Sequence, residues 1–169
     1  MAPSGDYFCP AYRLSETSAD AVSAWVDDQR WPAGTRLKHP GKYHVTCVYS
    51  PIGWGDQGNH AWLSGRAECS FLAPVVAVEM FGAKRRGRPR PVALRLHSTD
   101  LEAHAEATID AVEDELSLPV SRSTGGYTPH LTVAYALETV SLPAPALKLE
   151  LGPLYEHHSC IRELQRRGL

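Results

Sequence analysis

The stretch "PHLTVAY", residues 129–135, decides how this chain is interpreted, because it places a histidine and a threonine two positions apart in an apolar run. In a strand, residues i and i+2 point to the same face. His130 and Thr132 would therefore share one face, while the apolar residues between and after them take the other. Such a strand would carry two polar side chains in a row on an otherwise buried element.

The same pattern occurs a second time. The stretch "YHVTCVY" places His44 and Thr46 at the same spacing, and in both stretches a tyrosine follows the threonine by three positions. Composition predicts fewer than one H-x-T triplet in a chain of this kind, yet three are present. The third, His97-Ser98-Thr99, has a local explanation, since "TDLE" is a capping box that opens a helix. A single H-x-T is typical of a core histidine, whereas the matched pair indicates a site.

Paired histidines and threonines suit acid–base chemistry. Imidazole titrates near neutral pH, so His44 and His130 on opposite sides of one reacting group can act as base and acid. The hydroxyls of Thr46 and Thr132 can donate hydrogen bonds to oxygens of that group as charge develops on them. The residues do not indicate which histidine is the base. No metal and no cofactor are needed for this chemistry, and we expect neither.

Composition describes an ordinary globular protein. The chain has 169 residues, 43% hydrophobic and 21% charged, with a formal net charge of -2. This charge argues against a protein that coats long polyanions, although a local basic site remains compatible with it. The chain contains no apolar run long enough for a membrane span and no secretory signal. Four scattered cysteines without a C-x-x-C pair are typical of a reduced, cytoplasmic protein.

Hydrophobic periodicity predicts an α+β fold in one domain, residues 1–169. The chain alternates strands and amphipathic helices, and its two halves follow the same order. We therefore expect one domain with two lobes. The expected strands are 7–14, 44–50, 75–82, 91–98 and 130–135, with one or two more within 146–164; the expected helices are 15–30 and 98–117. A glycine-rich loop is expected over 50–65, and a basic hairpin tip over 84–90.

With both motifs in place, the chain resembles the 2H phosphoesterases, which carry two H-x-[ST]-x motifs on pseudo-symmetric lobes. "HVTC" and "HLTV" match that pattern without departure. The family includes RNA 2′,3′-cyclic phosphodiesterases, once called 2′–5′ RNA ligases, and phage enzymes that destroy the cyclic oligonucleotide signals of CBASS defence. The stretches "YFCPAY", "HVTCVYS", "GYTPHLTVAY" and "LGPLYEHHS" look most like the phage branch, and a phage-encoded chain would act in the host cytoplasm. The resemblance implies a bilobal fold of two pseudo-symmetric lobes of antiparallel sheet, with helices packed outside and a central groove. It also implies catalysis by His44, Thr46, His130 and Thr132.

Four further residues are candidate substrate contacts, each with a structural alternative. Tyr12 could stack on a base or cover the core, and Tyr127, in a Gly-Gly loop before the second motif, presents the same choice. Trp62 could help form a lid beside the first motif or simply pack. The resemblance implies that Glu156 reads a base edge, although an exposed carboxylate is the default. His60, His157 and His158 suggest a metal, but no Cys or Glu lies at a ligand spacing.

Three classes of function remain open at this stage. The first is a metal-independent phosphodiesterase acting on a small nucleotide or a cyclic oligonucleotide, or on the 2′,3′-cyclic phosphate of an RNA end. The second is a module that binds a nucleotide without turnover, although a pure binder need not retain the acid–base pair. The third is an adaptor, for which no exposed apolar stripe gives support. A monomer is the default expectation.

Overall fold

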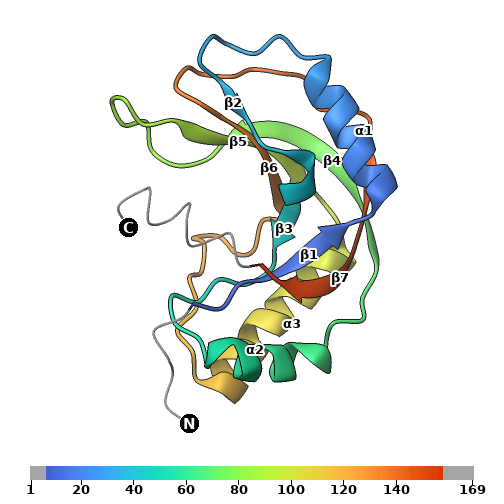
Figure 1. The fold of residues 1–169 in the computed structure, drawn as a ribbon, viewed down its shortest axis with the longest axis vertical. Coiled ribbons are helices and arrows are strands. Elements are labelled where there is room, and N and C mark those ends of the chain that lie inside the picture. The colour runs from blue at the N-terminus through green and yellow to red at the C-terminus, as the bar shows by residue number, and fades with distance from the viewer. Residues whose placement is uncertain (1–6, 158–169) are drawn as a thin grey trace.

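The computed structural model describes residues 7–157 (Figure 1). Strands and helices alternate along the chain, as the periodicity predicts. The helices are α1 (Glu16–Asp27), the short 3-10 helix η1 (Pro40–Lys42), α2 (Gly55–Ser64) and α3 (Thr99–Leu116). The strands are β1 (Pro10–Leu14), β2 (Arg36–Leu37), β3 (His44–Thr46), β4 (Phe71–Met80), β5 (Arg90–Leu96), β6 (His130–Ala136) and β7 (Lys148–Glu156).

All strand pairs are antiparallel, in the order β2-β6-β3-β1-β7-β4-β5. Strand β6 also pairs with β5, so the sheet curls and the pairings close into a ring. One lobe consists of β3, β1 and β7, and the other of β2, β6 and β5. The long strand β4 joins them, because its first residues pair with β7 and its later residues pair with β5. The predicted α+β fold class is confirmed.

Helix boundaries follow the capping signals closely. The Ser15 hydroxyl accepts a hydrogen bond from the Ser18 amide at the start of α1. At α3 the cap is Ser98, whose hydroxyl accepts from the Leu101 amide, so the cap lies one residue before the predicted Thr99. A short polar side chain can cap the helix from either position. The extended backbone of Ser98 makes this residue the cap.

The expected loop over 50–65 is wrong, because residues 55–64 form helix α2. Glycines lower intrinsic helix propensity, but packing overrides it here. The Asn59 side chain accepts a hydrogen bond from the Trp54 amide, and the Trp54 indole donates to the Leu116 carbonyl of α3. Helices α2 and α3 therefore lie side by side (Figure 1).

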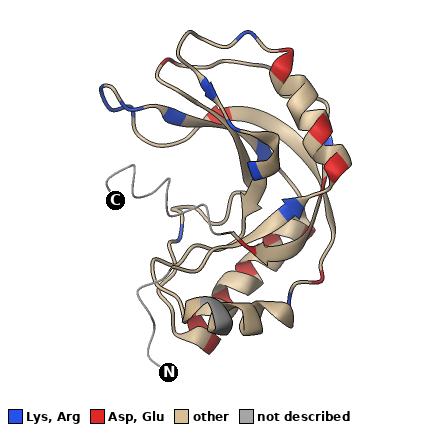
Figure 2. Cartoon of the chain, viewed as in Figure 1, with Lys and Arg blue, Asp and Glu red and all other residues tan. Residues whose placement is uncertain are grey.

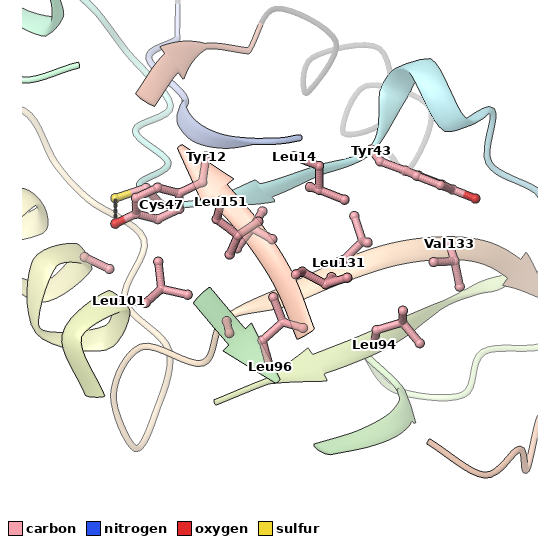
Figure 3. Packing of buried hydrophobic residues seen from close by; sticks show 14 of the residues in the cluster. Tyr12, Leu14, Tyr43, Cys47, Leu94, Leu96, Leu101, Leu131, Val133 and Leu151 are labelled. Atoms are coloured by element: carbon pink, nitrogen blue, oxygen red, sulfur yellow. Dashed lines mark hydrogen bonds between the residues drawn. The ribbon is translucent and has the colours of Figure 1, made fainter. Parts of the chain in front are cut away.

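The hydrophobic core fills the space between the curled sheet and the helices. Its fully buried side chains come from both lobes, as Figure 3 shows. Tyr12 belongs to this core, and its hydroxyl accepts a hydrogen bond from the Cys47 thiol at 3.3 Å. The larger fully buried residues are Phe8, Tyr12, Val22, Val45, Val48, Leu94, Leu96, Leu101, Leu118, Leu131, Leu149 and Leu151.

The described residues contain neither a membrane-spanning helix nor a disulfide. No helix within residues 7–157 is long and apolar enough to cross a bilayer. Cys9, Cys47 and Cys69 are reduced thiols, and the first two are buried. Cys160 and His158 lie outside the described residues.

Candidate active site

The two motif strands lie next to each other. Strand β3 pairs antiparallel with β6, and Val45 is the partner of Leu131. Both of these side chains are fully buried in the core. Because side chains alternate along a strand, the residues on either side of this pair point to the opposite face. That face, called the motif face below, carries His44, Thr46, His130 and Thr132.

The register relates the two motifs by a local two-fold axis through the Val45–Leu131 pair. Antiparallel pairing sets His44 opposite Thr132 and Thr46 opposite His130. The histidines are then diagonal neighbours, a relation that separates Cα atoms by about 7–8 Å. The charge of His130 also lowers the pKa of His44, so the two rings are close enough to interact electrostatically.

Both motif rings are held in the same way. His44 Nδ1 lies 2.9 Å from the Lys42 carbonyl oxygen, and His130 Nδ1 lies 2.9 Å from the Thr128 carbonyl oxygen. A carbonyl can only accept, so each Nδ1 carries the hydrogen and donates it. This leaves Nε2 of each neutral ring as the nitrogen with a lone pair, available to take up a proton.

The two rings have different neighbours, and these neighbours shift the pKa of each ring differently. His44 is only 8% exposed, and its ring stacks on His157 with centroids 3.6 Å apart. Burial, followed by the charges of Lys38 and His157, lowers the pKa of His44 to about 3. Burial also lowers the pKa of His130, whereas the nearby Glu79 carboxylate acts to raise it.

The environment of His130 is partly apolar as well. Its ring stacks on Phe81 with centroids 4.5 Å apart. The charge of Lys38 lowers the pKa of this histidine too, so one cation acts on both rings. A lysine near both imidazoles places a positive charge where a phosphate bound between them would need one.

Comparison with solved structures identifies the fold. The chain is similar to LigT of E. coli in complex with NADP+, at 17% identity and TM-score 0.60, covering 92% of this chain and 88% of that one. It is similar to a phosphoesterase at 18% identity and TM-score 0.64, covering 90% and 88%. The protein TT0787 of Thermus thermophilus has 17% identity, TM-score 0.58 and coverage of 89% and 84%. The chain has the 2H phosphoesterase-like fold.

No protein-family model matches the sequence, and comparison with curated proteins finds no match either. The 2H phosphoesterase-like fold is therefore established by structure. The fold is shared at an identity of 17–18%, where comparison of sequences finds nothing. This agrees with the predicted bilobal arrangement.

Tyr12 is not on the motif face, and its position favours the alternative that it covers the core; a contact with substrate stays a prediction. Its ring is fully buried, and its register partners are Val45 and Leu154 on the core face of the sheet. The hydroxyl lies 2.8 Å from Nδ1 of His104 on α3. Alternation along β1 turns the ring of Tyr12 away from the histidines.

Tyr127 and Trp62 have structural contacts. The Tyr127 hydroxyl donates to the Thr46 carbonyl at 2.9 Å, so this ring braces the strand that carries the first motif. The Trp62 indole donates to a Glu115 oxygen at 3.0 Å, and its ring meets Phe8 edge-on. These contacts place Trp62 between α2 and α3, which favours packing over a lid.

Glu156 lies at the end of β7, beside the residue that stacks on His44. Its carboxylate accepts a hydrogen bond from the Asn59 amide at 2.9 Å, and Asn59 is itself buried. A role for Glu156 in reading a base stays a prediction. Within residues 7–157, no group of three or more His, Cys, Asp or Glu side chains is arranged to hold a metal ion.

Three further residues of this site have little signal in the sequence. The sequence indicates His157 only as a possible metal ligand, yet its ring stacks on His44 and its Nδ1 lies 3.0 Å from the Tyr155 hydroxyl. Phe81 and Lys38 carried no signal, because neither belongs to a motif and both reach the histidines only through the fold. The adjacent "YEHH" was the one local hint for His157.

Proposed function

We propose that this chain is a metal-independent phosphodiesterase that cleaves a phosphodiester or a 2′,3′-cyclic phosphate in a nucleotide by two-histidine acid–base catalysis. The observation that carries the proposal is the pair of His-x-Thr motifs on adjacent strands, facing the same way and related by a two-fold axis. The equal Nδ1 bonds of both rings support it, because they present both Nε2 atoms for proton transfer.

The two histidines take different roles in this proposal. His44 has the lower pKa and is neutral at physiological pH, so it serves as the base that takes the proton from the nucleophile. His130, near the Glu79 carboxylate, serves as the acid that protonates the leaving oxygen. Thr46 and Thr132, each opposite one histidine, donate to the non-bridging oxygens.

The nucleophile is the ribose 2′-hydroxyl next to the reacting phosphorus. It is already part of the substrate, so its attack avoids the entropic cost of recruiting water. The 2′-oxygen bonds to phosphorus, the bond to the 5′-oxygen breaks, and a 2′,3′-cyclic phosphate forms. Water can then open this ring with the two histidine roles exchanged.

Nucleotide substrates are also supported by the structural neighbours. LigT has been crystallised with NADP+, with ATP and with 3′-AMP. Two kinds of nucleotide fit the proposal: cyclic oligonucleotides such as those of CBASS signalling, and RNA ends with a 2′,3′-cyclic phosphate. The fold is compatible with both, and the resemblance of "LGPLYEHHS" to the phage branch favours the first.

The test is turnover of a substrate panel by the wild-type chain and matched histidine variants. The panel contains 2′,3′-cyclic mononucleotides, 2′–5′ and 3′–5′ dinucleotides and cyclic di- and trinucleotides, with products identified by mass. His44→Ala and His130→Ala should each lose about 10²–10⁴-fold in rate, without additivity in the double variant. His97→Ala is the control, because this exposed ring lies off the motif strands and pairs with Glu102 at 2.9 Å. Full activity in either motif variant would contradict the mechanism.

A further inference from the structure

An arginine lies opposite each motif histidine, on the strand that flanks the motif pair on that side. Arg13 of β1 is the register partner of His44, and Arg95 of β5 is the register partner of His130. Residues directly opposite in an antiparallel pair share a face, so both arginines belong to the motif face. The two-fold axis that relates the motifs therefore also relates the arginines.

Side-chain contacts place Arg13 on this face independently of the register. Its guanidinium carbon lies 4.3 Å from the centre of the Tyr155 ring, a cation–π contact. The Tyr155 hydroxyl bonds to His157, whose ring stacks on His44. A continuous set of contacts thus connects the Arg13 guanidinium to the first catalytic ring. Within residues 7–157, Arg13 pairs with this aromatic ring and with no carboxylate.

Arg95 is placed by a different contact. Its guanidinium lies 3.2 Å from Glu79, and its side chain is 44% exposed. The Glu79 charge also acts on His130, so the ion pair lies beside the second catalytic ring. The guanidinium is oriented by Glu79 and still open to solvent, which leaves further N–H groups for a ligand.

Small residues complete the two-fold pattern. Ala11 is the register partner of Thr46, and Ala93 is the register partner of Thr132. A methyl group at these positions leaves space above the threonines for a phosphoryl group. The two arginines are three strand spacings apart across the sheet, or about 14 Å. They therefore lie outside the catalytic centre, one on each side.

We propose that Arg13 and Arg95 are phosphate-binding arms that hold the phosphates flanking the scissile one. A guanidinium binds phosphate through paired N–H donors, and a lone 2′,3′-cyclic mononucleotide offers no charge to either arm. The preferred substrate class is therefore an oligonucleotide, linear or cyclic, with a charged linkage on each side of the reacting phosphorus. This inference rests on the proposed function and specifies its substrate.

The test pairs changes in the protein with changes in the substrate. The probe is a tetranucleotide in which only the ribose before the central linkage has a 2′-hydroxyl, so that cleavage is confined to that linkage. Two further probes replace one outer phosphate by an uncharged methylphosphonate. In the wild-type chain each replacement should lower kcat/KM roughly tenfold. Arg13→Gln should abolish the discrimination at one outer position, and Arg95→Gln at the other.

Two further measurements sharpen the result. Each arginine variant should reduce the slope of log affinity against log salt by about 0.7, as for one phosphate contact on a single strand. Glu79→Gln should strengthen binding several-fold, because it removes the anion that competes for Arg95. Arg86→Gln, at the exposed tip of the β4–β5 hairpin, is the matched control and should leave the discrimination unchanged.

Binding of a 2′-O-methyl form of each probe, followed by calorimetry, tests the arms without turnover. If both arginine variants keep the wild-type discrimination between charged and uncharged outer linkages, the arms do not exist. Cleavage of the central linkage by the wild-type chain would still support the proposed function in that case. Failure of the wild-type chain to cleave the tetranucleotide or any cyclic phosphate would contradict the proposed function. The binding measurement would still show in that case whether Arg13 and Arg95 bind the outer phosphates.

Discussion

At the scale of single residues, the two catalytic candidates have the same backbone anchor and different neighbours. Each Nδ1 donates to the carbonyl two residues earlier, so local geometry makes the rings equivalent. Burial and the His157 stack act on His44, and Glu79 acts on His130. Equivalent geometry with unequal pKa values is what an acid–base pair requires.

The pH dependence follows from these shifts. In the proposed mechanism activity needs neutral His44 and protonated His130, so kcat/KM of the free enzyme should be highest between the two pKa values. The pKa of His44 is about 3, and the pKa of His130 lies below the ordinary value of 6.5. The rate should therefore fall as pH rises above the pKa of His130, on the acidic side of neutrality.

Two charge-removing variants test this assignment in opposite directions. Lys38→Gln should move the alkaline limb to higher pH, because the lysine charge lowers the pKa of His130. Glu79→Gln should move it to lower pH, because the carboxylate charge raises that pKa. A profile of kcat/KM against pH for the three proteins measures both shifts. Movement of the limb in the same direction in both variants would contradict the role of His130.

The threonines should matter less than the histidines. Thr46→Val and Thr132→Val each remove one hydroxyl donor at nearly constant shape, and each should cost about ten- to a hundredfold in kcat. The two-fold relation predicts losses of similar size. Single-turnover rates on one substrate provide the measurement, and a variant with wild-type kcat would remove its hydroxyl from the mechanism.

At the scale of elements, strand β7 has a bend that only glycine allows. Gly152 has φ of +126°, and a Cβ there would lie 2.0 Å from the Cys69 carbonyl oxygen. The pairing register between β1 and β7 shifts at this point. Beyond the bend, β7 carries Tyr155 and leads to His157, so this close approach helps to place the site.

Gly152→Ala should therefore destabilise the fold strongly. We expect a loss on the order of 3 kcal/mol in the free energy of unfolding, since neither the backbone conformation nor the Cys69 backbone can easily yield. Gly65→Ala is the matched control, because its φ is -76° and nothing lies within 4 Å of the added Cβ. Urea denaturation of both variants measures the difference, and equal midpoints would contradict this explanation.

At the scale of the whole molecule, the charges are separated. Figure 2 shows Lys and Arg on the β4–β5 hairpin and on the strands near the motif face, whereas most Asp and Glu lie on α1 and α3. A chain with net charge of -2 thus presents a basic region beside its candidate site. This distribution would draw an anionic substrate toward the site and away from the helices.

Global stability should depend on pH through the motif histidines. In the unfolded chain His44 takes up a proton near pH 6.5, whereas in the folded protein its pKa is about 3. The unfolded state therefore binds more protons between these values, and the free energy of unfolding should fall by up to about 1.4 kcal/mol per pH unit as pH decreases. The lowered pKa of His130 acts in the same direction.

Denaturant unfolding at several pH values between 6.5 and 4.5 measures this slope. The variant His44→Gln lacks the titrating ring and should show a shallower decline than the wild-type chain. An identical slope in both proteins would mean that His44 is not held neutral by the fold.

The sequence by itself determined the fold class and the catalytic candidates. Strand alternation put His44 and Thr46 on one face, and His130 and Thr132 on one face, because a period of two is a local property of the backbone. Helical periodicity and caps located α1 and α3 in the same local way. These local signals did not predict α2, where the contacts of Trp54 and Asn59 outweigh the glycine content.

Only the tertiary structure decided what surrounds the motifs. The Val45–Leu131 pairing, the stacking of His157 on His44, and the positions of Arg13 and Arg95 all depend on strand register between distant segments. Tyr12 shows how much depends on register, since a shift of one residue along β1 turns a side chain from the motif face into the core. The register of each strand pair is selected because it buries the whole apolar face of the sheet at once. The free energy of this burial is a sum over the entire core, so no short stretch of sequence predicts it.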